Sequence, residues 1–194
     1  MMTFLVLTTI ITILFLIITF SLLFKIHLLY KKLKYVDEAK MWHKLAITDD
    51  LTGIYNRNAY NNKIIKMKEN ITKKLYGIIL FDVDDFKVFN DTEGHLVGDR
   101  VLKEVAKILL EIFPEPKYRV FRIGGDEFAV ISENVSENEI IKRLLVLKEH
   151  LESSDNIRLS KGYSIVDGNI DQAFKYADEM LYADKQSKKS SHML

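Results

Sequence analysis

The sequence has 194 residues, a formal net charge of +1 and no cysteine. A chain of this length can bury one core of its own. The absence of thiols excludes disulfides, thiolate metal sites and cysteine nucleophiles. With 28 basic and 27 acidic residues, the chain lacks the overall positive charge of a typical nucleic-acid binder, so an anionic ligand has to be bound locally.

The first 24 residues contain no charged side chain and are rich in Ile, Leu, Phe and Thr. About 20 apolar residues are enough for a helix to cross a bilayer, so residues 1–24 are predicted to form a transmembrane helix. The alternative is a cleavable signal peptide, which would show a basic start, a shorter apolar region and a small-residue cleavage site. The lysines that follow the span predict a cytoplasmic carboxy-terminal part, by the positive-inside rule: Lys25, Lys31, Lys32 and Lys34.

Residues 25–47 are predicted to form a short helical stalk. Its apolar positions continue a heptad pattern that starts at Leu22 and runs through Ile26, Leu29, Leu33 and Val36. Two interpretations remain open. The stalk pairs two chains as a coiled coil, or it rests on the membrane surface or on its own domain.

The remaining residues, 48–194, are predicted to form one α+β domain with a ferredoxin-like mixed sheet flanked by helices. A turn-rich segment, 49–57, leads to a helix with Asn56 as its N-cap. His95, beside a glycine, is predicted to be packed or capping rather than a metal ligand. The inward faces of the last two helices are predicted to carry Ile140, Ile141, Leu144, Leu145 and Leu147, and then Phe174, Ala177, Leu181 and Tyr182. The expected elements are helix 57–70, strand 76–83, two helices opening near 86 and 98, strands 118–123 and 128–131, helix 136–149, strand 156–164 and helix 171–186.

Two acidic segments meet in this fold. Gly124 and Gly125 stand between two apolar runs, a pattern typical of a hairpin whose turn residues take positive φ. Asp126 and Glu127 then lie at the hairpin tip, although a Gly-Gly-Asp-Glu segment taken alone also fits an ordinary solvated turn. The strand 76–83 ends on Asp82, and in a ferredoxin-like fold this strand end and the hairpin tip can lie side by side.

Clustered carboxylates repel one another and have raised pKa values unless a cation neutralises them. A few hard oxygen ligands suit Mg²⁺, which takes its remaining ligands from water and substrate phosphates. The cluster therefore predicts phosphoryl or nucleotidyl transfer. Three lysines are candidates for neutralising a triphosphate: Lys87, Lys185 and Lys189.

Over residues 48–190 the chain resembles the GGDEF-domain diguanylate cyclases, whose fold is of the nucleotide-cyclase or palm type. The segments that carry the resemblance occur in the same order as in the family. They are Asp49-Asp50-Leu51-Thr52-Gly53, Phe81-Asp82-Val83-Asp84-Asp85-Phe86-Lys87, Asn90-Asp91, Gly94-His95, Gly98-Asp99, Arg122-Ile123-Gly124-Gly125-Asp126-Glu127-Phe128 and Ala177-Asp178-Glu179-Met180-Leu181-Tyr182.

The resemblance implies that two GTP molecules condense into cyclic di-GMP with release of two pyrophosphates, each domain of a homodimer holding one GTP. It implies a metal site of Asp82, the Val83 carbonyl and Asp126, with Glu127 in support, for Mg²⁺ or alternatively Mn²⁺. Asp126 matches the base for the ribose 3′-hydroxyl. Lys87 and backbone N–H groups near Asp85 and Phe86 are expected to bind phosphates, while Asn90 and Asp99 are expected to bind the guanine edge.

Three features depart from the family pattern. Lys189 stands where Arg is usual, and Lys188 and Ser190 replace Gly and Asn, which predicts a weaker grip on the triphosphate. Glu115-Pro116-Lys117-Tyr118 replaces the Arg-x-x-Asp inhibitory site, so product binding there is predicted to be absent. No sensor domain separates the span from the domain, so a signal has to enter through the span, the stalk or a protein partner.

Together, the span and the resemblance predict a single-pass protein of the bacterial inner membrane, with lipid around its N-terminal helix, a cytoplasmic catalytic domain, and no nucleic-acid partner. The alternative is a catalytically inactive GTP-binding module of the same fold that acts through a sensor or effector protein.

Overall fold

A computed structural model describes residues 2–152 and 157–191 of the chain. The chain divides into two compact units, Met1–Leu45 and Ala46–Leu194. Each unit has its own structure and is described separately.

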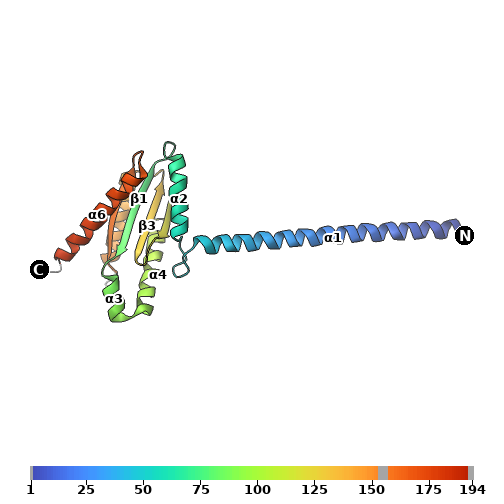
Figure 1. The fold of residues 1–194 in the computed structure, drawn as a ribbon, viewed down its shortest axis with the longest axis horizontal. Helices are drawn as coiled ribbons and strands as arrows, with labels where there is room; N and C mark the ends of the chain where they lie inside the picture. The colour runs from blue at the N-terminus through green and yellow to red at the C-terminus, as the bar shows by residue number, and fades with distance from the viewer. Residues whose placement is uncertain (1, 153–156, 192–194) are drawn as a thin grey trace. The chain divides into compact units, whose positions relative to one another are not determined.

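The first unit consists of most of a single helix, α1 (Met2–Ile47). Its stretch Val6–Ile47 is long and apolar enough to cross a membrane, with a mean hydropathy of 2.6 and none of the apolar window buried. The predicted span and the predicted stalk therefore form one uninterrupted helix, drawn in blue in Figure 1. The division at residue 24 and the pairing of the stalk stay predictions.

The second unit follows the predicted order of elements. After α2 (Arg57–Asn70) come β1 (Tyr76–Val83), α3 (Phe86–Glu93), α4 (His95–Ile112), β2 (Tyr118–Arg122), β3 (Glu127–Glu133), α5 (Glu137–Glu152), β4 (Leu159–Val166) and α6 (Ile170–Ser191). The four strands form one sheet in the order β2-β3-β1-β4.

This topology confirms the ferredoxin-like α+β class. All three neighbouring pairs of the described strands run antiparallel, so the expectation of a mixed sheet is wrong in that respect. β1 lies between β3 and β4, and both of these strands run antiparallel to it. β2, on the far side of β3, runs antiparallel to β3.

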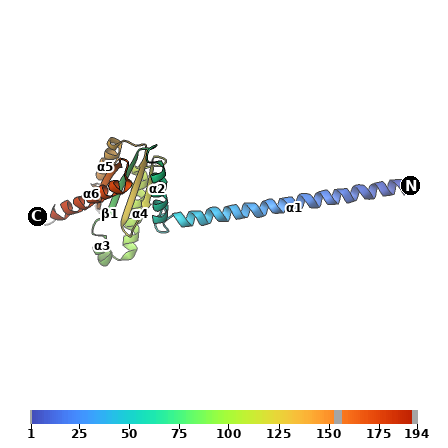
Figure 2. The same cartoon turned by 45° about the horizontal axis from the view of Figure 1, so that its top comes forward.

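Helices cover both faces of the sheet. Ile79, Phe81 and Val83 of β1 belong to one core with buried residues of α4 and α5. Ile78 and Leu80 belong to the other, with residues of α2 and α6. Since β1 is central and covered on both faces, all eight of its residues are buried. Figures 1 and 2 show the strands between the helices.

Several local predictions are confirmed. Asn56 caps α2 by accepting a hydrogen bond from the N–H of Ala59 at 3.1 Å. The bounds of α2 and β1 are those expected. α4, however, starts at His95, three residues before the expected Gly98, because Gly94 at φ 87° already breaks the chain. Of the two roles predicted for His95, packed or capping, its exposure contradicts the first.

The predicted inward faces are only partly correct. α5 buries Ile140, Leu144 and Leu147, whereas Leu145 is 55% exposed. α6 buries Ala177, whereas Tyr182 is 65% exposed. Each helix packs through a narrower stripe than its apolar residues suggest. Of the predicted strand 156–164, the structure places β4 from Leu159 onward, and Asn156 lies outside the described residues.

Candidate functional site

The site is built at the carboxyl end of β1. In the sheet register, Asp82 is the partner of Glu127, the first residue of β3. The N–H of Val83 donates to the carbonyl oxygen of Asp126 at 3.2 Å. The end of β1 and the turn before β3 therefore lie side by side, as the fold class predicted.

The turn itself differs from the expected geometry. Four residues, 123–126, connect β2 and β3, and the N–H of Ile123 donates to the Glu127 carbonyl at 2.9 Å. Neither glycine of the turn has a positive φ. A Cβ at Gly124 would overlap the Glu127 carboxylate, so a larger residue there would displace this exposed side chain.

An arginine fixes this turn to the segment that enters the domain. Arg122 donates through Nη2 to the Gly125 carbonyl at 2.7 Å and through Nη1 to Asp49 at 3.0 Å. Asp49 also accepts hydrogen bonds from the N–H and the hydroxyl of Thr52. Burial pushes the pKa of Asp49 upward, but the bonds from Thr52 and the Arg122 guanidinium outweigh it and lower the pKa below its usual value of 3.8.

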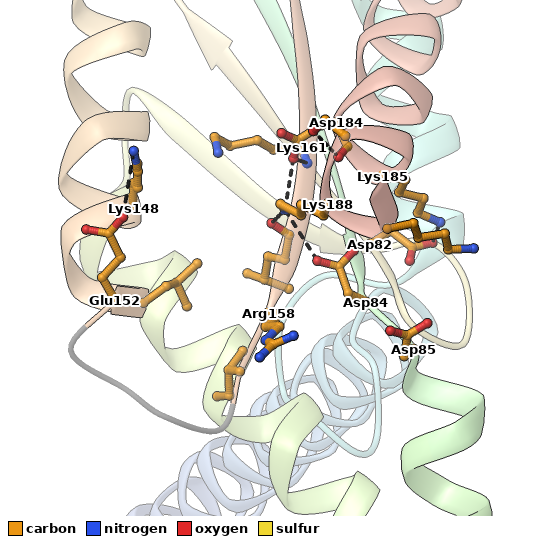
Figure 3. Close-up of a pocket in the computed structure, with 15 residues that line it drawn as sticks. Asp82, Asp84, Asp85, Lys148, Glu152, Arg158, Lys161, Asp184, Lys185 and Lys188 are labelled. Atoms are coloured by element: carbon orange, nitrogen blue, oxygen red, sulfur yellow. Dashed lines mark hydrogen bonds and ion pairs between the residues drawn. The ribbon is translucent and has the colours of Figure 1, made fainter. Parts of the chain in front are cut away.

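Lysines from the last turns of α6 contact the acidic loop that follows β1. Lys185 pairs with Asp82 at 2.7 Å, and Lys188 pairs with Asp84 at 3.3 Å and with Asp184 at 2.9 Å. These residues line a cavity of about 680 Å³ that also includes Lys189, Asp85 and Arg158. Figure 3 shows the lysines of α6 reaching toward the carboxylates.

Asp82 is the carboxylate that gains most from a cation. Burial raises its pKa above the usual value, the neighbouring Asp126 and Asp84 raise it further, and the ion pair with Lys185 opposes the rise. Loss of the Lys185 pair would leave a buried carboxylate next to two others, which favours replacement of the lysine by another cation.

The predicted guanine-binding residues lie on α3 and α4, apart from the residues that line the cavity. The side-chain oxygen of Asn90 is buried and has no hydrogen-bond partner in the part of the chain that the structure describes. A Cβ at Gly98 would overlap this oxygen, and the Phe86 ring lies against the same glycine. Asp99, on the first turns of α4, is partly buried. The side-chain oxygen of Asn90 is thus a hydrogen-bond acceptor that a ligand with an N–H or O–H group can pair with.

The N-terminus of α3 faces the loop without a side-chain cap. Asp85 precedes it in the left-handed conformation at φ 54°, and it makes no capping hydrogen bond. Uncapped N–H groups at a helix start favour anions such as phosphate. Lys87, one residue into the helix, is exposed, in a position open to a phosphate from solvent.

The metal site predicted from Asp82, Val83, Asp126 and Glu127 stays a prediction. Among the described residues there is no ready-made group of three acidic, histidine or cysteine side chains that could hold a metal ion. The donors nevertheless fit a divalent cation by their chemistry, because they are hard oxygens and the buried Asp82 already has a cationic partner.

Sequence reasoning missed the ion pairs of Asp84, Asp184 and Lys188, which line the cavity, and the hydrogen bond from Ser160 to Asp84 beside it. The spacing of Asp184 and Lys188, four residues apart on a helix, was a signal of one of these pairs. The contact of α6 with the loop after β1 left no trace in the sequence, since the partners are about a hundred positions apart.

Comparisons with known proteins agree with this arrangement. The family described as "Diguanylate cyclase, GGDEF domain" matches residues 46–191. The probable diguanylate cyclase DgcI of Escherichia coli K12 is 38% identical over 148 residues, which cover 73% of this chain and 32% of that protein. An uncharacterized membrane protein of Staphylococcus haemolyticus is 32% identical over 178 residues, covering 79% of this chain and 49% of the relative.

Among solved structures, the coiled coil and GGDEF domain of DgcB from Caulobacter crescentus, in complex with c-di-GMP, has a TM-score of 0.74 at 25% identity. The match covers 81% of this chain and 90% of that one. The chain spans about a third of the first of these curated relatives and about half of the second.

Proposed function

Since the chain belongs to the GGDEF family of diguanylate cyclases, we propose that it is a membrane-anchored diguanylate cyclase that condenses two GTP into cyclic di-GMP and two pyrophosphates as a homodimer. The observation that carries the proposal is the pairing of Asp82 with the turn of Asp126 and Glu127 at one end of the sheet. An apolar helix long enough to span a membrane supports the anchor, and the lysines after residue 24 support a domain on the cytoplasmic side of the bacterial inner membrane.

On this proposal, Asp82, the Val83 carbonyl and Asp126 hold a divalent cation, Mg²⁺ or Mn²⁺, with Glu127 in support. The bound cation supplies charge neutralisation at the attacked phosphate and acidifies the ribose 3′-hydroxyl. Asp126 accepts the proton of that hydroxyl. Its place in a turn held by Arg122 keeps its backbone fixed.

The triphosphate is bound by groups around the uncapped start of α3. Lys87 and the N–H groups at Asp85 and Phe86 approach it from this helix, and Lys185 and Lys189 approach from α6. Lys185, which pairs with Asp82 in the absence of a metal ion, would be free to bind a phosphate if a divalent cation were held at that carboxylate. Lysine at position 189 gives a point charge rather than a bidentate fork.

The guanine base supplies the donor that Asn90 lacks. The buried oxygen of Asn90 accepts a hydrogen bond from it, and Asp99 accepts from the N1–H and N2–H₂ pair. Adenine offers no such pair of donors, so it would leave both acceptors unpaired in a partly buried site.

A product assay tests the proposal. Full-length protein in detergent or nanodiscs, given GTP and Mg²⁺, should form cyclic di-GMP, and Asp126→Asn should lower turnover by about a thousandfold or more, as for loss of a group that acts in the transition state. The control is a melting curve, which should not change. Wild-type protein that binds GTP without forming product would contradict the enzyme and support the second candidate.

The second candidate, an inactive GTP-binding module that works through protein partners, is favoured by one observation. Lys188 neutralises Asp84 within the chain itself, which opposes metal binding at that carboxylate. Titration calorimetry separates the two functions, since the module would bind GTP tightly without turnover.

A further inference from the structure

Lys188 has surroundings unlike those of the other pocket lysines. Its Nζ donates to the carbonyl of Leu159 at 2.6 Å and to Ser160 Oγ at 3.2 Å. It also lies 2.9 Å from a carboxylate oxygen of Asp184 and 3.3 Å from one of Asp84. We call this set of four oxygen atoms, one each from Leu159, Ser160, Asp184 and Asp84, the Lys188 seat. Figure 3 shows Lys188 between Asp84 and Asp184.

The seat is a closed network from three parts of the fold. Ser160, which accepts from Lys188, donates its own hydroxyl to the other oxygen of Asp84. Asp184 also accepts from the backbone N–H of Lys161 at 3.0 Å. Its groups come from the loop after β1, from β4 and from α6, so their positions are fixed relative to one another by the packing of the sheet and helix.

The donor set of the seat is that of a hard cation. Two carboxylates, one carbonyl and one hydroxyl are oxygen ligands of the kind that Ca²⁺, Mg²⁺ and Mn²⁺ take in proteins. An ammonium group has three N–H donors and no acceptor. Four acceptors therefore leave Lys188 without a donor to offer to a nucleotide phosphate, whereas the ion pair of Lys185 is with the single carboxylate of Asp82.

We propose that the ammonium of Lys188 is a tethered cation that fills the seat between Asp84 and Asp184 and excludes dissolved divalent ions from it. Of the two carboxylates, Asp82 at the end of β1 is then available to a metal ion, whereas Asp84 in the following loop is not. The sequence of this chain thereby limits the number of metal ions that bind at the end of β1.

This inference goes beyond the proposed function, because it requires neither GTP nor turnover. The inference rests on the contacts of Lys188 alone. It can therefore be correct for a chain without cyclase activity, and it can be wrong for an active cyclase.

The first experiment titrates nucleotide-free, full-length protein in detergent with Mn²⁺ and follows free Mn²⁺ by electron paramagnetic resonance. Lys188→Met keeps most of the side-chain length and removes the charge, and it should bind one additional Mn²⁺ per chain. Lys189→Met is the matched control, because it removes the same charge from the same cavity but makes none of the contacts of the seat. It should leave the number of bound ions unchanged.

The double variant Lys188→Met/Asp184→Asn should lose the additional ion again, since it removes one of the two carboxylates. If folded Lys188→Met binds the same number of Mn²⁺ ions as the wild type, or if Lys189→Met gains an ion equally, the proposal is wrong.

The second experiment uses the unaltered chain. It tests whether Mn²⁺ displaces Lys188 even if Lys188→Met does not fold. Lysines are acetylated briefly with a water-soluble succinimidyl ester, with and without saturating Mn²⁺, and each site is quantified by peptide mass spectrometry. Lys188 should stay protected relative to Lys189 in both conditions. Exposure of Lys188 by Mn²⁺ would show that the metal displaces the lysine, and this would overturn the proposal.

Discussion

The position of the Asn90 side chain depends on the absence of a Cβ atom at residue 98, which is glycine. Its side-chain oxygen occupies the space that a Cβ at position 98 would need, and it has no hydrogen-bond partner among the described residues. A buried acceptor without a donor costs free energy, about 1–3 kcal/mol. A ligand that supplies the donor recovers this free energy on binding, so the unliganded domain is poised for such a ligand.

Gly98→Ala should therefore displace Asn90 and raise the KM for GTP by about tenfold, the effect of losing roughly 1.4 kcal/mol of binding free energy. The turnover number should change much less, because Asn90 contacts the base rather than the reacting atoms. Steady-state kinetics of cyclic di-GMP formation measure both constants. In an Asn90→Ala background the same change should add little, and fully additive effects in the double-mutant cycle would contradict this account.

Lys63 is the other residue with unusual surroundings, at the far end of β1 from the candidate site. It is 7% exposed and ion-pairs with Glu133, which also pairs with Lys74 at 2.7 Å. Burial, together with the smaller effect of the cations Arg119, Lys74 and Lys66, lowers the pKa of Lys63 to about 8. The folded state thus holds the proton of Lys63 less tightly than the unfolded state does.

The sign of the resulting pH dependence follows from linkage. Between the folded pKa of about 8 and the ordinary lysine value of about 10.4, the unfolded chain binds more protons, so the contribution of Lys63 to stability rises with pH. Relative to Lys63→Met, the wild type should gain roughly 1 kcal/mol between pH 8 and 10, after allowance for solvent screening. Thermal melting of both proteins across this range measures the difference, and a constant difference would contradict the assignment.

At the scale of elements, β4 and α6 approach each other closely. Gly162 in β4 lies so near the helix that a Cβ would overlap the carbonyl of Ala177 and the N–H of Leu181. Both neighbours are backbone groups, which cannot move aside as a side chain can. The position of α6, and of every lysine on it, is therefore set by this contact.

Gly162→Ala should push α6 away from the sheet and destabilise the domain by about 1–3 kcal/mol, the usual cost of overpacking. It should also weaken GTP binding, because Lys185 and Lys189 move with the helix. Melting temperature and GTP titration are the two measurements. Lys175→Ala, on the exposed side of α6, is the control. Wild-type values for Gly162→Ala in both measurements would show that the helix position is not fixed in this way.

The elements also show how far the sequence could be interpreted. Turn and cap signals act locally, so Asn56 marked the start of α2 correctly. Which apolar residues are buried depends on what packs against them. Leu145 and Tyr182 fit the helical period and are nevertheless exposed, because α5 and α6 each meet the sheet along one narrow stripe.

At the scale of the whole molecule, the family, the fold and the acidic motifs could be predicted because they lie in short contiguous segments. The ion pairs of α6 could not. Lys185 with Asp82 and Lys188 with Asp84 join residues about a hundred positions apart, and their pairing depends on the placement of α6 against β4. The glycine turn was predicted for the wrong reason, since neither of its glycines has a positive φ.

The proposed reaction needs two chains, because each domain is expected to hold one GTP. Below the dissociation constant of the dimer, a tenfold dilution should therefore lower specific activity by about tenfold. Product formation at constant detergent concentration measures this. Added Asp126→Asn chains should inhibit the wild type by forming mixed dimers. Specific activity that stays constant on dilution to a demonstrated monomer would contradict the dimer.

The lysines of α6 have a consequence for the resting protein. Many domains with clustered acids collapse or unfold when a chelator removes their ions, because metal binding supplies part of their folding free energy. Here the counter-charges at Asp82 and Asp84 are covalently part of the chain. We therefore expect the metal-free domain to stay folded in EDTA. Affinities for metal ions measured from this state then contain no free energy of folding.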